Sequence, residues 1–450
     1  MVVSDAAEGR VAALETGALF PLVARLAVPS IIGVSVSAVY QVLNAFFVGK
    51  LGTHATAAMA VTFPIAMLLT AVGQCFGVGT ASIVARSLGR NDRGEANRFA
   101  TAGVVCGTAV AGLLAVLLIV IARSLLTLLG ATPNTLSMGL TYASWLLVGY
   151  VANVFNMVCG FIVRAEGNTR FSMATQIAAF ATNALFDPVF IFVCKLGIAG
   201  AGAATLLGQS FAGLMYISYF SRQRGTVKLC RLRPVLLHNH GLAIVRIGGS
   251  SAIGAVAGML SLSALNRVAA PYGDGAVAGI GIASRLVLVA TLPVSGLCIG
   301  AQSVLGFNLG ARNWVRVKEA VSVIVRLALA FTGCYAAIIF LTASDVVQVF
   351  SGNVAVLNVA RRAVQIFHLG LPLFAVQAVT MALLQAKGEA ARASLLAVAR
   401  PLMVPLLVVM KSCGGLGGLM LAQLSIDGII GALAVILLIR ELRRLGDGGI

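Results

Sequence analysis

Long apolar segments, separated by short polar ones, follow one another along most of this chain. A helix needs about 20 predominantly apolar residues to cross a hydrocarbon core of about 30 Å. Twelve segments meet that length, and we expect membrane-spanning helices at 19–49, 56–85, 99–123, 136–162, 172–194, 198–220, 241–268, 276–307, 319–343, 354–385, 392–411 and 413–439. An even number of spans places both ends of the chain on the same side of the membrane.

The composition supports this all-α, polytopic membrane protein and indicates its orientation. Hydrophobic residues make up 59% of the 450 residues and charged residues only 10%, against about 25% in a soluble domain. Basic residues recur at every second loop: Arg86, Arg90, Arg93 and Arg98; Arg164 and Arg170; Arg222, Arg224, Lys228, Arg231 and Arg233; Arg312, Arg316 and Lys318; Arg440, Arg443 and Arg444. This positive-inside pattern predicts that these loops and both termini are cytoplasmic. The net charge of +18 therefore reflects the orientation of the chain in a lipid bilayer, and we expect a multi-pass protein of the cell membrane. We expect no nucleic-acid partner.

An internal repeat divides the chain into two halves. Three pairs of matching positions are separated by nearly the same number of residues. Asn44 and Asn266 lie 222 residues apart, and Gly89 and Gly310, like Gly167 and Gly388, lie 221 residues apart. Each half contains six spans, so the two lobes should be related by a pseudo-two-fold axis along the membrane normal. We expect a cytoplasmic N-terminal segment (1–18), an N-lobe (19–221), a cytoplasmic linker (222–240), a C-lobe (241–440) and a cytoplasmic tail (441–450).

The fifth span carries Asn183 and Asp187, four residues apart and therefore on one face of a helix. A carboxylate at the centre of a membrane helix costs about 2.5–3.5 kcal/mol on translocon scales, and such residues generally line a cavity or an ion pathway. The repeat places Val404 and Val408 at the equivalent positions of the second half. A packing role should be common to both halves, so the polar pair indicates a site that only the first half contains.

Other polar residues of the first half are candidates to complete this site. Asp187 could carry a proton, because low-dielectric surroundings favour the neutral form of a carboxyl group. Sodium prefers hard oxygen ligands, which Asp187, Asn183, Asn44 and Thr205 could supply together. Asn153 and Asn156 in the fourth span lie in the same half. Asn and Thr also join membrane helices by hydrogen bonds, so a structural role stays open for Asn44, Asn156 and Thr205.

The second half contains one intramembrane acid, Asp427. It could form an ion pair with Arg285, Arg400 or Lys411, or bind a cationic substrate. Gln74 and Gln302 occupy comparable places in the second and eighth spans and are candidates for the cavity lining. His368 in the tenth span is either a hydrogen-bonded buried histidine or a proton relay.

Several classes of protein lack support in the sequence. The eight cysteines are isolated, which favours neither disulfides nor a zinc site. We find no catalytic motif and no Walker A motif, so we expect neither an enzyme nor an ATP-driven pump. We also expect no cofactor other than a coupling ion. The N-terminus lacks the pattern of a signal peptide, so the first span should be retained. Nothing in the sequence requires an oligomer, and we expect a monomer.

Five segments together resemble the multidrug and toxic compound extrusion (MATE) family over roughly residues 18–440. These are QVLNAFFVGKLG, FNMVCGFIVRAEGNTRFSM, NALFDP, GIAGAGAAT and AQSVLGFNLGARN. The resemblance implies export of amphipathic, often cationic, small molecules in exchange for protons or sodium by two V-shaped lobes that alternate in access. It also implies a coupling-ion site at Asn183, Asp187, Thr205 and Asn156, and a bend of the first span at Pro29.

Asn44 departs from the family pattern, which usually has an aspartate at this position of the first span. An asparagine can coordinate a cation but cannot carry a proton, so Asp187 is the only acid of the first-half cavity. This leaves proton and sodium coupling both open, with protons favoured. Two alternative functions predict other features. A lipid-precursor flippase should have a strongly basic cavity, and a channel or membrane enzyme should have a filter or a catalytic constellation.

Overall fold

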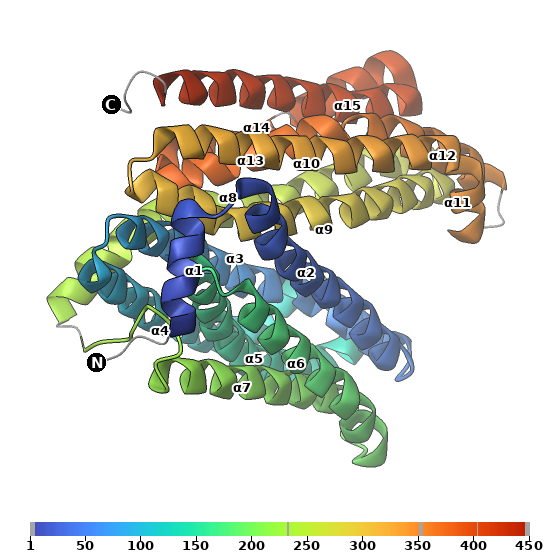
Figure 1. Ribbon diagram of the computed structural model, residues 1–450. Helices are drawn as coiled ribbons and strands as arrows, with labels where there is room; N and C mark the ends of the chain where they lie inside the picture. The colour runs from blue at the N-terminus through green and yellow to red at the C-terminus, as the bar shows by residue number, and fades with distance from the viewer. Residues whose placement is uncertain (1–4, 232–233, 351–353, 403, 446–450) are drawn as a thin grey trace.

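The computed structural model describes residues 5–231, 234–350, 354–402 and 404–445, and all regular secondary structure in these ranges is helical (Figure 1). The first half contains α1 (Asp5–Thr16), α2 (Leu19–Gly49), α3 (Thr53–Gly89), α4 (Arg93–Leu128), α5 (Pro133–Ala165), α6 (Thr169–Pro188), the π-helix η1 (Val189–Val193) and α7 (Ile198–Ser221). The second half contains α8 (Pro234–Ala269), the 3-10 turn η2 (Ala270–Tyr272), α9 (Asp274–Gly310), α10 (Trp314–Leu341), α11 (Ala343–Phe350), α12 (Val354–Leu369), α13 (Leu371–Lys387), α14 (Ala390–Leu402) and α15 (Val404–Arg444).

These helices provide the twelve expected spans. Nine single segments are long and apolar enough to cross a membrane, and α12 with α13 forms a tenth span that bends by 43° at Gly370. The segment Ala390–Arg444 also qualifies but is 55 residues long, which is enough for two spans. Gly415, at φ 57° and ψ −139°, breaks the helix within α15 and separates the eleventh span from the twelfth. The prediction of an all-α protein with twelve spans is confirmed.

The spans form two groups that meet at one end and diverge at the other. Helices α2–α7 make up the N-lobe and α8–α15 the C-lobe, and Figure 1 shows the two groups close together near α1 and spread apart at their opposite ends. The meeting end carries the arginine-rich loops after α3, α7 and α9, and we call it the basic end.

Glycines allow the two lobes to approach closely at the basic end. A Cβ on Gly248 of α8 would collide with the backbone oxygen of Cys75 on α3, and one on Gly310 of α9 would collide with that of Arg86. Membrane helices commonly use small residues in this way to bring backbones together. Ser82 of α3 adds a hydrogen bond of 2.5 Å to the carbonyl oxygen of Gln385. The basic end is therefore closed by direct backbone contact between the lobes.

Helix α1 lies across this closed end and contacts both lobes. The side chain of Leu14 is almost fully buried, and its carbonyl oxygen accepts a hydrogen bond of 3.2 Å from Asn308 of α9. Arg316 of α10 donates to the carbonyl oxygen of Gly17, while Arg10 donates to that of Arg224 at 3.1 Å. The sequence predicted only a cytoplasmic segment here, since its short polar pattern does not indicate a docking surface.

The chain after α7 is held to the N-lobe by Glu166, which is fully buried just after α5. Its carboxylate accepts hydrogen bonds from the backbone N–H groups of Thr226 (2.8 Å) and Val227 (3.0 Å) and from the Tyr219 hydroxyl. Burial raises the pKa of Glu166 above its usual value, and these hydrogen bonds counteract part of that rise. The first residues of the expected linker are thus packed against the N-lobe.

Adjacent glycines of α8 provide a direct test of this closure. We expect Gly248→Ala to destabilise the protein by about 1–3 kcal/mol, the usual cost of overpacking, because its methyl group would meet the Cys75 backbone. Gly249 has nothing within 4 Å of the same added atom. Gly249→Ala should therefore leave the melting temperature unchanged or raise it slightly, since Ala favours a helix more than Gly. Equal melting temperatures for the two variants would contradict close lobe contact at Gly248.

Candidate functional site

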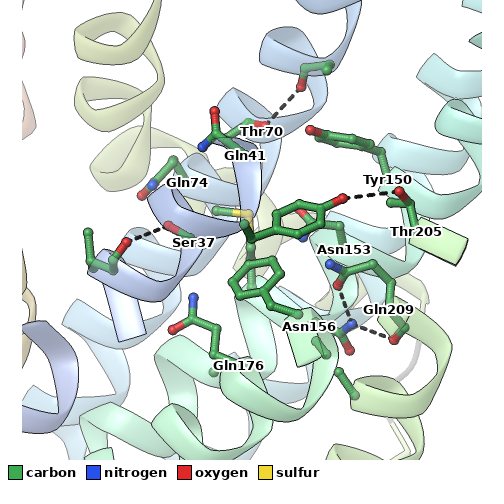
Figure 2. A pocket seen from close by; sticks show the side chains of 18 of the residues that line it. Ser37, Gln41, Thr70, Gln74, Tyr150, Asn153, Asn156, Gln176, Thr205 and Gln209 are labelled. Carbon is green, nitrogen blue, oxygen red and sulfur yellow. Dashed lines mark hydrogen bonds between the residues drawn. The ribbon is translucent and has the colours of Figure 1, made fainter. Parts of the chain in front are cut away.

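A cavity of about 590 Å³ lies mainly in the N-lobe, at the border with the C-lobe. Its wall comes from α2, α3, α5, α6 and α7, together with Leu292, Ser295 and Ile299 of α9. Figure 2 shows a band of amides and hydroxyls that point into this space, among them Gln41, Gln74, Asn153, Gln176 and Gln209. A cavity of this size, apolar in part and lined by neutral polar groups, suits an organic molecule of drug size.

The predicted pair on α6 lies directly behind the cavity wall. Asp187 is fully buried and Asn183 is only 2% exposed, and neither lines the cavity itself. With its amide oriented to satisfy both ends, Asn183 donates from Nδ2 to Asp187 Oδ2 at 2.8 Å. Its Oδ1 accepts from the hydroxyl of Tyr40 at 3.2 Å and from the backbone N–H of Thr205 at 2.8 Å.

Tyr40 and Thr205 connect this buried pair to the cavity, because both line its wall. Their hydroxyl oxygens lie 3.2 Å apart, and Figure 2 draws this hydrogen bond as the dashed line that ends at Thr205. Asn44 donates to the Tyr40 hydroxyl at 3.4 Å. The structure therefore brings together four of the residues singled out in the sequence, Asn44, Asn183, Asp187 and Thr205, around a tyrosine that the sequence analysis missed. The spacing of Tyr40 and Asn44, one helical turn apart on α2, was the available signal.

The free oxygen atoms of this cluster limit the ion that it could hold. Asp187 Oδ1 and Asn44 Oδ1 are buried without hydrogen-bond partners, whereas Asn183 Oδ1 accepts from Tyr40 and the Thr205 backbone. The Thr205 hydroxyl donates to the carbonyl oxygen of Ala201 at 3.0 Å. A proton needs only the free carboxylate oxygen. A sodium ion would need several oxygens, and of the four proposed ligands Asp187 and Asn44 each have one without any hydrogen-bond partner, while the Thr205 hydroxyl donates and keeps lone pairs for a cation.

Asn156 belongs to a different part of the cavity. Its Nδ2 donates to the carbonyl oxygen of Gln209 at 2.7 Å and to Gln209 Oε1 at 2.9 Å, as Figure 2 shows. The described residues thus connect Asn156 to α7 one turn beyond Thr205, rather than to Asp187. Gln74 lines the cavity, as expected. Gln302 does not; it lies between the lobes beside Arg164, in a small pocket of about 10 Å³.

Two further sequence candidates lie outside the cavity lining. Pro29 is in α2, which continues as a single helix from Leu19 to Gly49. His368 is fully buried, with Nδ1 2.6 Å from the carbonyl oxygen of Val364 and its ring stacked on Tyr335 at 5.8 Å. Both positions fit packing roles in this conformation.

Asp427 forms an ion pair in the C-lobe, away from the cavity. Its Oδ1 lies 2.5 Å from Nη2 of Arg400, one of the three basic partners considered from the sequence. Its Oδ2 accepts a hydrogen bond of 3.1 Å from Gln423. Both carboxylate oxygens are therefore satisfied inside the lobe, which favours the structural interpretation of this acid.

We expect the Asp427–Arg400 pair to act as a unit. Asp427→Asn or Arg400→Gln alone should destabilise the protein by about 2–3 kcal/mol, below the range for a fully buried pair because both groups are partly exposed. The double variant should lose less than the sum of the two single losses, with a coupling energy of about 1 kcal/mol or more. Thermal unfolding of the four proteins measures this cycle. Additive losses would contradict a coupled pair.

The two-lobed helical fold and its cavity are those of a membrane transporter. The MatE family model matches residues 29–189 and 251–409, one segment in each lobe. The chain therefore belongs to the MatE family, the extrusion family that its motifs resemble.

Similar proteins agree with this assignment. The chain is 27% identical over 434 residues to the multidrug export protein MepA of Staphylococcus saprophyticus, and 27% identical over 437 residues to MepA of Staphylococcus aureus strain NCTC 8325, with 95% of each chain covered in both cases. A solved MATE protein in a bent conformation has a TM-score of 0.91 at 24% identity, covering 98% of this chain and 99% of the other. A transporter of the MOP superfamily from Pyrococcus furiosus has a TM-score of 0.89 at 24% identity, covering 96% and 98%. These structures have the same two-lobed, twelve-helix fold.

Proposed function

We propose that the protein is a proton-coupled antiporter that exports amphipathic, including cationic, compounds through the N-lobe cavity, with Asp187 as the coupling residue. The observation that carries this proposal is the free Oδ1 of a fully buried carboxyl group. The Asn183–Tyr40–Thr205 hydrogen bonds connect that group to the cavity wall. Membership of the MatE family and the similarity to multidrug export proteins support the transport of drugs.

Protonation of Asp187 would alter the hydrogen bonds around it. The ionised carboxylate only accepts, and it receives the Asn183 amide at 2.8 Å. A protonated Asp187 is neutral and carries an O–H donor, so its attraction to that amide weakens. The change would reach α2 through Tyr40, and α2 contains Pro29, where a missing backbone donor favours a bend. We propose Pro29 as the hinge through which the proton influences the cavity wall.

The geometry of the lobes supports transport by alternating access. The basic loops indicate that the closed end faces the cytoplasm, so this conformation would be outward-facing. Export then requires the contacts at the basic end to open and the diverging ends to close. The absence of an aspartate at Asn44 leaves one carboxyl group in the cluster, which suits a single proton per cycle.

A flippase for lipid-linked precursors receives less support from the cavity. Recognition of a pyrophosphate group calls for several basic side chains, whereas the described cavity lining contains one, Arg164. The polar lining consists otherwise of neutral amides and hydroxyl groups. This composition fits a drug-sized amphipathic compound better than a highly charged headgroup.

Transport in proteoliposomes tests the proposal. We expect an imposed pH gradient to drive the flux of a fluorescent cationic dye, and a sodium gradient at constant pH to drive none. Asp187→Asn should lower the pH-driven flux by at least about tenfold, the effect of 1.4 kcal/mol, because the amide cannot release a proton. Asp345→Asn, which alters an exposed acid of α11, should transport like the wild type.

Each alternative predicts a different result in the same assay. If a sodium gradient drives dye flux and Asp187→Asn abolishes that flux, the coupling ion at this site is sodium and not the proton. Undiminished pH-driven flux in Asp187→Asn would show that Asp187 is structural. If neither gradient moves any dye in the wild-type protein, the antiporter proposal is wrong and transport of lipid precursors should be assayed instead.

A further inference from the structure

Arg164 is the one acidic or basic side chain among the described residues that line the cavity. It lies in the last turn of α5, near the basic end, and it lines both the main cavity and the small pocket beside α9. The coupling cluster around Asp187 lies behind the wall and presents only Tyr40, Asn44 and Thr205 to the cavity. A molecule in the cavity would therefore meet a positive charge and no exposed carboxylate.

The positive charge of Arg164 has no counter-charge in the described part of the chain. Its Nη1 donates to the hydroxyl of Ser172 at 2.7 Å, and its guanidinium lies over the ring of Phe161, 4.5 Å from the centroid. Its Nε is buried without an acceptor. The nearest acid along the chain, Glu166, is occupied by Tyr219 and by two backbone N–H groups of the chain after α7. Buried charges are normally paired, so an unpaired one calls for an explanation.

A second unpartnered donor lies next to Arg164. Gln302 of α9 is buried, and its Nε2 has no acceptor among the described residues. Arg164 and Gln302 line the same pocket of about 10 Å³, and Ile299 lines both this pocket and the main cavity. That volume accommodates roughly one oxygen-sized atom. Two donors without an acceptor, one of them on a charged side chain, thus belong to residues that line the same small pocket.

A purely structural role accounts for only part of this arrangement. A cation near a helix C-terminus and over an aromatic ring is stabilised by both, but neither contact provides an acceptor for Nε. The repeat places Gln385 at the equivalent position of the C-lobe, where it is neutral and donates to Ser251 at 2.9 Å. The C-lobe therefore has a neutral, hydrogen-bonded residue at this position, and the cation of the same helix end, Lys387, is paired with Glu389 and Glu441.

The Arg164 side chain and the cluster around Asp187 lie against opposite ends of α6. Ser172, which holds Arg164, and Asp187 are fifteen residues apart on this helix, or roughly 22 Å at 1.5 Å per residue. Between them the cavity presents amides and the stacked rings of Tyr40 and Phe180, 4.7 Å between centroids. A ligand with an aromatic body could lie against this middle part and extend an acidic group towards Arg164.

We propose that Arg164, assisted by Gln302, binds an anionic oxygen of the transported compound, so that the cavity selects amphipathic compounds that carry a carboxylate, including zwitterions. This inference rests on the proposed function only in taking the cavity as the place where substrate binds. It is independent of which ion drives transport. It predicts that the affinity of a dye depends on an acidic group and not on its cationic ring system alone.

Two matched dyes test the proposal with the full-length protein in detergent. Rhodamine B and its ethyl ester share the same cationic xanthene ring system. Rhodamine B carries a carboxylate where the ethyl ester carries an uncharged ester group. Equilibrium dialysis, with the dyes quantified in acidified ethanol, gives both dissociation constants. We expect the wild type to bind rhodamine B at least about tenfold more tightly than the ester, since a charge-assisted hydrogen bond contributes roughly that factor. Equal affinities, or tighter binding of the ester, would overturn the proposal without any variant.

Variants then locate the effect. Arg164→Gln, which introduces the residue of the C-lobe repeat, should lower the affinity for rhodamine B about tenfold and leave that for the ester unchanged. Gln302→Glu should do the same by placing a competing carboxylate beside Arg164. Arg170→Gln, which changes an exposed arginine of α6, is the matched control and should retain both affinities. Equal weakening of both dyes in Arg164→Gln would assign Arg164 to structure and contradict the proposal.

The two proposals fail in different ways. If the wild type prefers rhodamine B but Asp187→Asn still transports dye, the coupling proposal fails and the anion site stands. If pH-driven dye transport depends on Asp187 but the two rhodamines bind equally, the anion site fails and the antiporter stands. Size-exclusion profiles and melting temperatures identify any variant that does not fold. In that case the ratio of the two rhodamine dissociation constants of the wild type tests the anion-binding proposal.

Discussion

A polar group inside a bilayer has no water to bind, so it must find its hydrogen-bond partner within the protein. This constraint gives significance to each buried polar atom of the N-lobe. Asp187 is satisfied at Oδ2 by Asn183, and Asn183 is satisfied by Tyr40 and by the Thr205 backbone, but Asp187 Oδ1 has no partner. A membrane protein that retains a carboxyl group with a vacant oxygen retains a place for a proton or a cation. The proposed coupling depends on that free oxygen.

Closure of the basic end depends on contacts that can be broken without leaving a charge uncompensated. The ion pairs of Glu95, Asp427 and Glu441 each lie within one lobe. The contacts that cross between the lobes include hydrogen bonds from Ser82 and Arg86 to backbone oxygens of the C-lobe, together with close packing at glycines. In the alternating-access cycle that we propose, such bonds would be exchanged for water when the lobes separate at the membrane surface. The charged networks would then hold each lobe together as a unit.

The sequence allowed the fold to be predicted further than the site. Twelve apolar segments and a repeat of about 221 residues were sufficient for two lobes of six spans, because membrane helices must be long and apolar. The four-residue spacing of Asn183 and Asp187 predicted one face of a helix, and the structure joins them by a hydrogen bond. Their position behind the cavity wall could not be predicted, since the 3.6-residue period shows which residues share a face but not which neighbour covers them.

Tertiary packing decided the remaining residues. Asn156 and Thr205 were grouped together because both are polar and lie in the same half, yet Asn156 bonds to Gln209 on the next turn of α7. Arg400 could be named as one of three partners for Asp427, but only the packing of α14 against α15 selects it. Tyr40 carried no signal beyond its spacing from Asn44. Its hydroxyl becomes important because α2, α6 and α7 meet around it.

The two halves of the repeat share a backbone plan but differ in chemistry. At the positions of Asn183 and Asp187 the C-lobe has Val404 and Val408, and at the position of Arg164 it has Gln385. These differences occur at both ends of the N-lobe cavity, one at the coupling cluster and one at the basic end. Among the described residues, Arg164 at the cavity and the free Oδ1 of Asp187 behind its wall both belong to the N-lobe. If both proposals hold, the driving ion and the acidic group of the cargo are recognised roughly 22 Å apart along α6, so that neither competes for the other's partner.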